Sequence, residues 1–96
     1  MVRHIINFKL KDCCRENCQK LKEVLESMEG NVPSVKNIDV RIDELRSHRS
    51  YDVYLCVDVD SWEQLDVYQK DAYHCDVVKK YVHGVIENSV AMDFEI

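Results

Sequence analysis

Residues 51–65, YDVYLCVDVDSWEQL, join a strand pattern directly to the start of a helix. Apolar side chains stand at every second position of the first part, an alternation typical of a β-strand with one buried face. That face carries Tyr51, Val53, Leu55, Val57 and Val59. Ser61 and Gln64 then occupy the positions of a capping box, which predicts that a helix begins there. The stretch therefore predicts a helix packed on a sheet.

Two more strands and a helix precede this unit. Residues 2–10 and 35–45 both alternate apolar and polar side chains, as strands do. Between them, residues 12–30 carry small or apolar side chains at the helical spacings of three and four. This stripe consists of Cys14, Cys18, Leu21, Leu25 and Met28. We expect Asp12 to cap the helix and Gly30 to mark its end.

Downstream, the second helix is expected to run through Tyr68, break near Asp71 and resume from His74 to about His83. Residues 87–96 then alternate again as a last strand. The apolar set of this strand, expected to face the helices, is Val90, Met92, Phe94 and Ile96. The order strand, helix, strand, strand, helix, strand predicts an α+β, ferredoxin-like βαββαβ fold, with both helices on one face of a four-stranded antiparallel sheet.

The face of the sheet away from the helices is predicted to be half polar. It would carry Ile5, Asn7, Lys9, Asp39, Arg41, Asp52, Tyr54, Cys56, Ala91 and Asp93. This set is too polar for a dry core, yet Ile5, Tyr54, Cys56 and Ala91 present more apolar surface than contact with water requires. We therefore expect the sheet to pack against that of a second copy, giving a homodimeric α/β barrel. The alternative is a monomer with an open, half-wet sheet.

The composition of the chain excludes several classes of protein. The 96 residues are expected to form a single domain, 1–96, and the net charge of −5 argues against a nucleic-acid partner. The opening, MVRHIINFKL, has no apolar run long enough for a signal peptide or a membrane span. The five cysteines are an odd number and show no C-x2-C pair for zinc. We therefore expect reduced thiols, a cytoplasmic location, and no metal.

Three stretches of this chain resemble one known family. MVRHIINFKLKD (1–12), YDVYLCVDVDSWEQLDVYQ (51–69) and ENSVAMDFEI (87–96) are together similar to the stress-responsive A/B-barrel domain family, Dabb. Tyr68, followed six residues later by His74 ahead of a VV pair, adds to the likeness. The resemblance implies small α+β domains that pair into dimeric barrels. Most members of the family have no assigned activity, and the family is associated with stress-induced plant proteins.

One branch of that family is a plant polyketide cyclase, which closes a ring by aldol chemistry without a cofactor. By this resemblance His74 would act as the base, Tyr68 would place and polarise the substrate, and His4 would line the same cavity. The family commonly reads His-Pro-x-His where this chain reads DAYH at 71–74. The second histidine is kept, while the first histidine and the proline are absent.

Two classes of function remain open at this point. The first is a non-enzymatic dimeric barrel of unassigned role, acting through its stability, its assembly or the binding of a small apolar molecule between the sheet and the helices. The second is a cofactor-free enzyme, either an aldol-type cyclase or one similar to the cofactor-free monooxygenases. Such an enzyme needs a base, supplied by His74, and a donor for the developing enolate oxygen, supplied by the hydroxyl of Tyr68. The missing His-Pro pair favours the first class, and neither class requires a cofactor.

The candidate ligand-binding residues are His4, Ile6, Phe8, Leu25, Trp62 and Tyr81, beside the candidate catalytic pair His74 and Tyr68. Each also has a purely structural interpretation, as part of a filled core. A histidine on the buried face, such as His4, needs a polar partner, and we expect Tyr68 or His74 to be that partner. A cavity beside His74 would support binding or catalysis, whereas a core closed by the bulky Tyr73 would exclude both.

Overall fold

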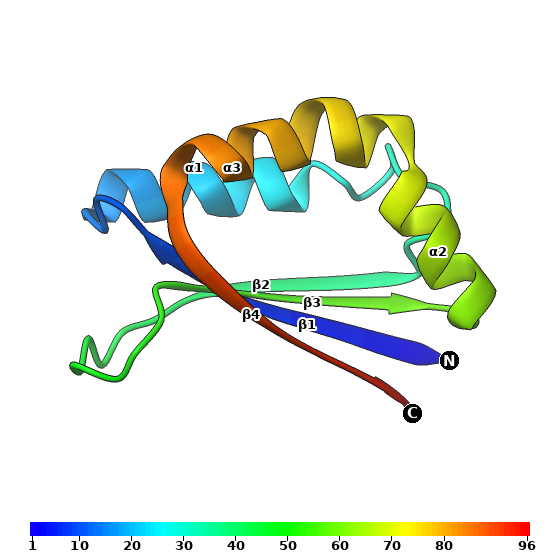
Figure 1. Cartoon of the computed structure of the whole chain (residues 1–96), viewed down its shortest axis with the longest axis horizontal. Helices are drawn as coiled ribbons and strands as arrows, with labels where there is room; N and C mark the ends of the chain where they lie inside the picture. Colours follow the sequence, from blue (N-terminus) through cyan, green and yellow to red (C-terminus); the bar gives the residue numbers. More distant parts are fainter.

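The computed structural model describes residues 1–96 as two layers, with all helices on one side of a four-stranded antiparallel sheet (Figure 1). The elements are β1 (Val2–Leu10), α1 (Arg15–Glu26), β2 (Asn37–Ile42), β3 (Val53–Val59), α2 (Trp62–Lys70), the π-helical segment η1 (His74–Lys79), α3 (Lys80–Val85) and β4 (Ile86–Glu95). The strands lie in the order β2-β3-β1-β4. This confirms the predicted ferredoxin-like element order. None of the helices has the length and apolar character needed to span a membrane.

The central strand β1 carries the predicted alternation into the core. In its antiparallel pairing with β3, His4 lies opposite Val57, Ile6 opposite Leu55, and Phe8 opposite Val53. These side chains share the face that the helices cover. The apolar core cluster consists of Val2, Phe8, Leu10, Cys18, Leu21, Leu25, Met28, Val32, Val40, Val53, Leu55, Val57, Val59, Tyr68, Val78 and Val82.

The first helix differs from its prediction at its start. Helix α1 buries Cys18, Leu21 and Leu25 as expected, but Cys14 is exposed and serves as the N-cap residue. Asp12 is therefore not the cap, although its carboxylate accepts a hydrogen bond from the backbone N–H of Cys14 at 3.3 Å. A helical spacing counted back from Leu21 places Cys14 on the stripe only if the helix extends that far. The helix instead begins at Arg15, one residue after Cys14.

The second helical region breaks where the sequence predicts. The hydroxyl of Ser61 accepts the backbone N–H of Gln64 at 3.2 Å, and α2 ends at Lys70. Asp71 then joins it to η1 in two ways. Its carboxylate accepts the backbone N–H of His74 at 3.1 Å, and its carbonyl accepts that of Cys75 at 2.9 Å. The wide turn of η1 thus starts at His74, and π-helical turns of this kind are frequent at functional sites.

The last strand corrects one of our predictions. In the β1–β4 pairing, His4 lies opposite Asp93 and Ile5 opposite Met92. Asp93 and Ala91 therefore face the helices, and the apolar set faces the other way; that set is Val90, Met92, Phe94 and Ile96. An alternating strand has two faces, and the alternation alone does not say which face is inside. The more apolar set seemed the natural inner one, and the register with β1 reverses this choice.

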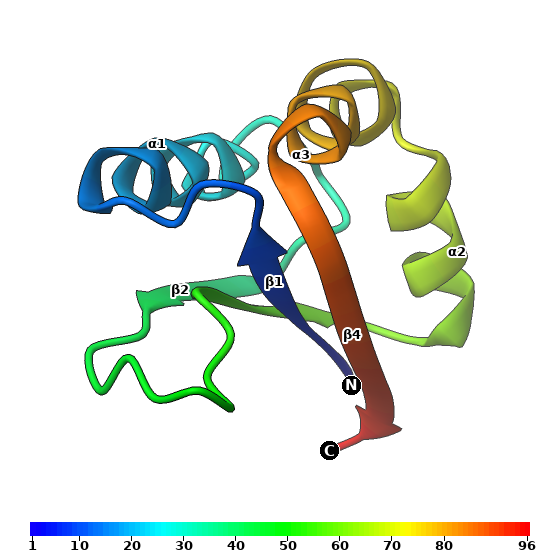
Figure 2. The same cartoon turned by 60° about the vertical axis from the view of Figure 1, so that its left-hand side comes forward.

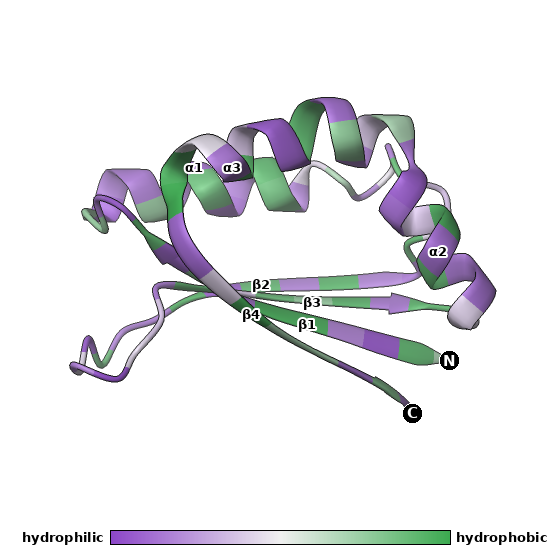
Figure 3. Cartoon of the chain, in the orientation of Figure 1, coloured by the Kyte–Doolittle hydropathy of each residue, from purple (hydrophilic) through white to green (hydrophobic).

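No helix covers the outer face of the sheet (Figure 2). Ile5, Tyr54 and Cys56 lie near its middle, as predicted, and the apolar set of β4 is exposed beside them. Figure 3 shows hydrophobic and hydrophilic bands alternating along β4. At one end of this face the guanidinium of Arg3 binds the carboxylate of Asp58 through two hydrogen bonds of 2.9 and 3.0 Å. The outer face is thus a band of exposed apolar side chains bordered by an ordered ion pair.

Candidate functional site

A cavity of about 150 Å³ lies between the sheet and the second helical region. It is lined by His4, Ile6, Phe8, Leu25, Leu55, Tyr68, Gln69, His74, Val78, Lys79, Val82, His83, Ile86 and Ser89. Six of the eight candidates named from the sequence are therefore brought together here. Tyr73 does not close the cavity, because its side chain leads to α1, where its hydroxyl donates to the hydroxyl of Ser27 at 2.7 Å.

Two of the candidates do not line the cavity. Trp62 is 48% exposed at the start of α2, where its indole N–H donates to the carboxylate of Glu95 on β4 at 2.9 Å. Tyr81 is half-buried and packs against the core cluster outside the cavity. Both aromatic residues therefore hold elements of the fold together.

The sequence interpretation missed most of the helical wall. Residues 74, 78 and 82 recur at a spacing of four, which places them on one side of a helix. Val78 and Val82 line the cavity together with His74 for this reason. Lys79 and His83, which directly follow Val78 and Val82, show the same spacing and also line the cavity. The spacing of four is visible in the sequence, but only the histidine and aromatic residues of this segment were selected as candidate site residues.

His4 is held by a residue that the prediction had placed on the opposite face. Its Nδ1 donates a hydrogen bond to the carboxylate of Asp93 on β4, so the expected partners, Tyr68 and His74, are wrong. His4 is buried and Asp93 is one-third exposed, so the carboxylate links a buried ring to the edge of the sheet. With Nδ1 occupied, Nε2 is the only ring nitrogen that His4 can offer to the cavity.

Tyr68 stands between the two histidines. Its ring centroid lies 5.8 Å from that of His4 in an edge-on arrangement and 4.4 Å from that of His74 in a tilted one. The hydroxyl donates to the sulfur of Met28 at 3.7 Å, which is a weak acceptor. Burial raises the pKa of Tyr68 well above its ordinary value, so the hydroxyl keeps its proton at neutral pH. Tyr68 therefore contributes an aromatic wall and a hydroxyl with only a weak partner.

His74 is the least satisfied polar group of the cavity wall. It is 9% exposed, and its Nδ1 is buried without a hydrogen-bond partner. Burial lowers the pKa of His74, and the positive charge of Lys79 lowers it further. The ring is therefore neutral at pH 7, and a neutral imidazole has one nitrogen able to accept a proton or a hydrogen bond. Buried polar atoms without partners are uncommon in folded proteins.

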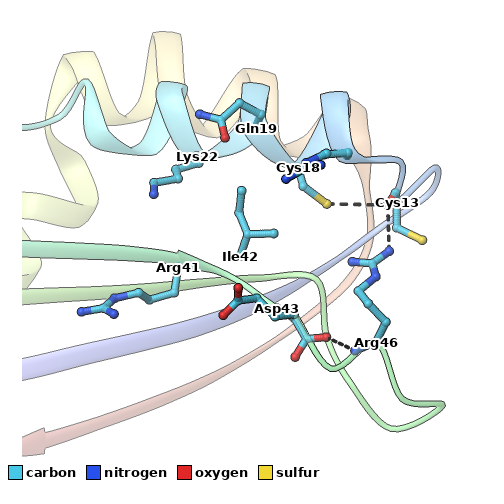
Figure 4. Close-up of a pocket in the computed structure, with 10 residues that line it drawn as sticks. Cys13, Cys18, Gln19, Lys22, Arg41, Ile42, Asp43 and Arg46 are labelled. Atoms are coloured by element: carbon cyan, nitrogen blue, oxygen red, sulfur yellow. Dashed lines mark hydrogen bonds between the residues drawn. The ribbon is translucent and has the colours of Figure 1, made fainter.

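A larger hollow of about 630 Å³ lies elsewhere, between α1 and the loop that follows β2 (Figure 4). It is an open groove, and two of the four cations that line it already have partners: the Arg46 guanidinium donates to the carbonyl of Cys13 at 2.8 Å, and Arg41 binds Asp39 at 2.8 Å. Small-molecule sites are mostly enclosed and apolar. The smaller cavity beside His74 fits that description better. No group of three or more His, Cys, Asp or Glu side chains is arranged to hold a metal ion.

The comparisons with known proteins agree with this architecture. A family model described as the stress-responsive A/B barrel domain, Dabb, matches residues 2–96. The chain belongs to the Dabb family. This confirms the family indicated by the sequence. No curated protein matches the sequence of this chain.

Solved structures share the Dabb fold at low identity. A dimeric ferredoxin-like protein of unknown function from Thermobifida fusca is 21% identical with a TM-score of 0.83, covering 99% of this chain and 90% of its own. One from Bacteroides fragilis, also dimeric and of unknown function, is 20% identical with a TM-score of 0.82 and coverages of 99% and 95%. A Dabb family protein from Mesorhizobium loti is 15% identical with a TM-score of 0.76 and the same coverages. At these identities the likeness shows the fold alone.

The link between His4 and Asp93 generates the first prediction. Replacing Asp93 with Ala leaves the buried Nδ1 of His4 without a partner, which typically costs about 1–3 kcal/mol. We expect Asp93→Ala to lower the free energy of unfolding by that amount in urea titrations followed by circular dichroism. Asp60→Ala is the matched control, because Asp60 makes only an exposed ion pair with Lys36, and its loss should stay within about 0.5 kcal/mol. Equal losses in both variants would contradict the assigned role of Asp93.

Proposed function

We propose that this Dabb protein is a homodimer whose sheet–helix cavity binds a small, largely apolar molecule. The observation that carries the proposal is the cavity itself. A chain of 96 residues leaves about 150 Å³ unfilled beside a buried histidine nitrogen that has no partner. Empty apolar volume lowers the stability of a small domain. A bound ligand therefore explains this cavity better than imperfect packing does.

The dimer is supported by the outer face of the sheet. Val90, Met92, Phe94 and Ile96 are all exposed there, on a strand whose free edge also leaves backbone groups unpaired. Exposed apolar bands of this kind mark protein–protein contacts. The solved relatives from Thermobifida fusca and Bacteroides fragilis are described as dimeric. Two sheets packed through these faces would bury the band.

The five free cysteines agree with a reducing compartment such as the cytoplasm.

Assembly through this face predicts the effect of a single charge. Met92 is 66% exposed, and Met92→Asp would place a charge within the interface. We expect the wild-type protein to sediment as a dimer at micromolar concentration and Met92→Asp to sediment as a monomer. Leu45→Asp is the control, since Leu45 is 81% exposed in the loop after β2, and it should remain dimeric. A monomeric wild type, or equal behaviour of the two variants, would go against the proposed interface.

The cavity is tested with two adjacent valines. Val78 lines the cavity, and Val77 is exposed on the same turn. We expect benzyl alcohol to bind the wild type saturably in NMR titrations, with shifts confined to cavity residues such as Leu25 and Val82. Val78→Phe should remove this binding by filling the space, and Val77→Phe should keep it. Absence of saturable binding to the wild type, or shifts outside the cavity, would refute the proposal.

A second candidate function is a cofactor-free enzyme, and the unpaired, neutral His74 favours it. His74 would take a proton from the carbon next to a carbonyl, and Tyr68, on exchanging Met28 for the ligand, would donate a hydrogen bond to the enolate oxygen. This is the step that begins an aldol-type ring closure. A monooxygenase-like reaction without a cofactor would begin with the same deprotonation.

Proton exchange separates this enzyme from a simple binding protein. In D₂O, we expect the wild type to speed deuterium incorporation next to the carbonyls of ethyl acetoacetate by about 10²-fold or more over buffer, if His74 acts as a general base. His74→Ala should lose this acceleration and remain dimeric. His48→Ala should retain it, because His48 is exposed in the loop between β2 and β3. If the wild type gave no acceleration, the enzymatic candidate would be refuted and only the binding function would remain.

A further inference from the structure

Three of the five cysteines lie close together at the start of α1, in the stretch CCRENC of residues 13–18. Cys13 and Cys18 both line the open groove between α1 and the loop after β2, whereas Cys14 does not (Figure 4). This groove shares no lining residue with the cavity beside His74. It therefore brings two thiols to one side of the helix start, at a place apart from the proposed ligand site.

Cys13 and Cys18 hold two positions whose side chains commonly meet. Cys14 is the N-cap residue of α1, so Cys13 precedes the cap and Cys18 is the fourth residue of the helix. Side chains at these positions often pack together as a hydrophobic staple. The thiol of Cys18 donates to the carbonyl of Cys13 at 3.7 Å, while the sulfur of Cys13 is turned outwards (Figure 4). Because Cys13 lies before the helix, its side chain can turn towards Cys18 while the helical hydrogen bonds stay in place.

The two thiols differ in their access to solvent. Cys13 is exposed, whereas Cys18 is 1% exposed and belongs to the core cluster. Burial raises the pKa of Cys18, and the neighbouring Arg46 guanidinium opposes this shift. A reagent in solution therefore reaches Cys13 first. Redox-sensing thiols are commonly exposed and lie next to a second cysteine that resolves them.

The carbonyl of Cys13 is also tied to a strained residue. Arg46 is the one non-glycine residue with a positive φ, at 58°. Its guanidinium donates to the carbonyl of Cys13 at 2.8 Å, and its backbone N–H donates to the carboxylate of Asp43 at 2.7 Å. Strained backbone of this kind is found mainly at active sites and switch regions. A covalent change at Cys13 would therefore reach the loop after β2 through Arg46.

We propose that Cys13 and Cys18 are a redox modification site, which a small-molecule disulfide such as glutathione disulfide converts to an internal disulfide. The thiolate of Cys13 attacks one sulfur of glutathione disulfide, whose S–S bond breaks and releases one glutathione thiolate. The thiolate of Cys18 then attacks the sulfur of Cys13 and releases the second glutathione. The two thiol protons pass to the two glutathione thiolates. The protein is thus oxidised by two electrons and glutathione disulfide is reduced by two, and excess reduced glutathione reverses the reaction.

The test is peptide mapping of the native protein after incubation with glutathione disulfide and blocking of the remaining thiols with N-ethylmaleimide. Trypsin releases Cys13 and Cys14 together in the peptide DCCR, and Cys18 in the peptide ENCQK. We expect these two peptides to be joined, with a combined mass lower by two hydrogen atoms. Excess reduced glutathione should separate them again. Absence of the joined peptides, or a glutathione that stays attached to Cys13, would overturn the proposal.

Two serine variants identify the partner of Cys18. Cys13→Ser changes an exposed position and should abolish the joined peptides. Cys14→Ser is the matched control, because Cys14 is exposed next in sequence but does not line the groove, and it should keep them. The reverse result would assign the disulfide to Cys14 and contradict the account. In nitrogen-15 NMR spectra, oxidation should shift the amide signal of Arg46 in the wild type and leave it in place in Cys13→Ser. An unmoved Arg46 signal in the oxidised wild type would contradict its link to the pair.

Discussion

The pairing of β1 with β4 is the constraint on which both functional surfaces depend. It sets Asp93 opposite His4 on the helix-covered face and Met92 opposite Ile5 on the outer face. A slip of one residue would exchange the two faces of β4. The carboxylate would then leave His4, and the apolar side chains of β4 would enter the cavity region. One register therefore orients the histidine in the cavity and also supplies the apolar band proposed as the dimer interface.

The second constraint is the break between α2 and the segment that follows it. Asp71 ends α2 and holds the backbone of His74 through its own carboxylate. No proline restrains this turn, and the Asp71 side chain fixes the backbone at the start of the next segment instead. The result is that His74 starts a wide helical turn with its ring against Tyr68.

Much of this arrangement was predictable from the sequence. The alternation in residues 2–10 and 53–59, and the break near Asp71, were sufficient to give the element order, and the inner face of β1 followed from His4, Ile6 and Phe8. The inner face of β4 was predicted wrongly, because the more apolar of its two sets of side chains faces away from the helices and only the register with β1 reveals this. The partner of His4 was missed for the same reason. Trp62 was wrongly chosen because a tryptophan can line a cavity or lie exposed on the surface, and the sequence does not distinguish the two environments.

The central claim is that the cavity beside the neutral His74 is a binding site, and histidine-selective nitrogen-15 NMR tests it most directly. The ring nitrogens of His74 should report a neutral imidazole at pH 7, because burial and Lys79 lower its pKa. They should shift when a one-ring ligand such as benzyl alcohol is added, while the ring of the exposed loop residue His48 should not. A charged His74 at pH 7, or a His74 ring that does not respond to saturating ligand, would contradict the account.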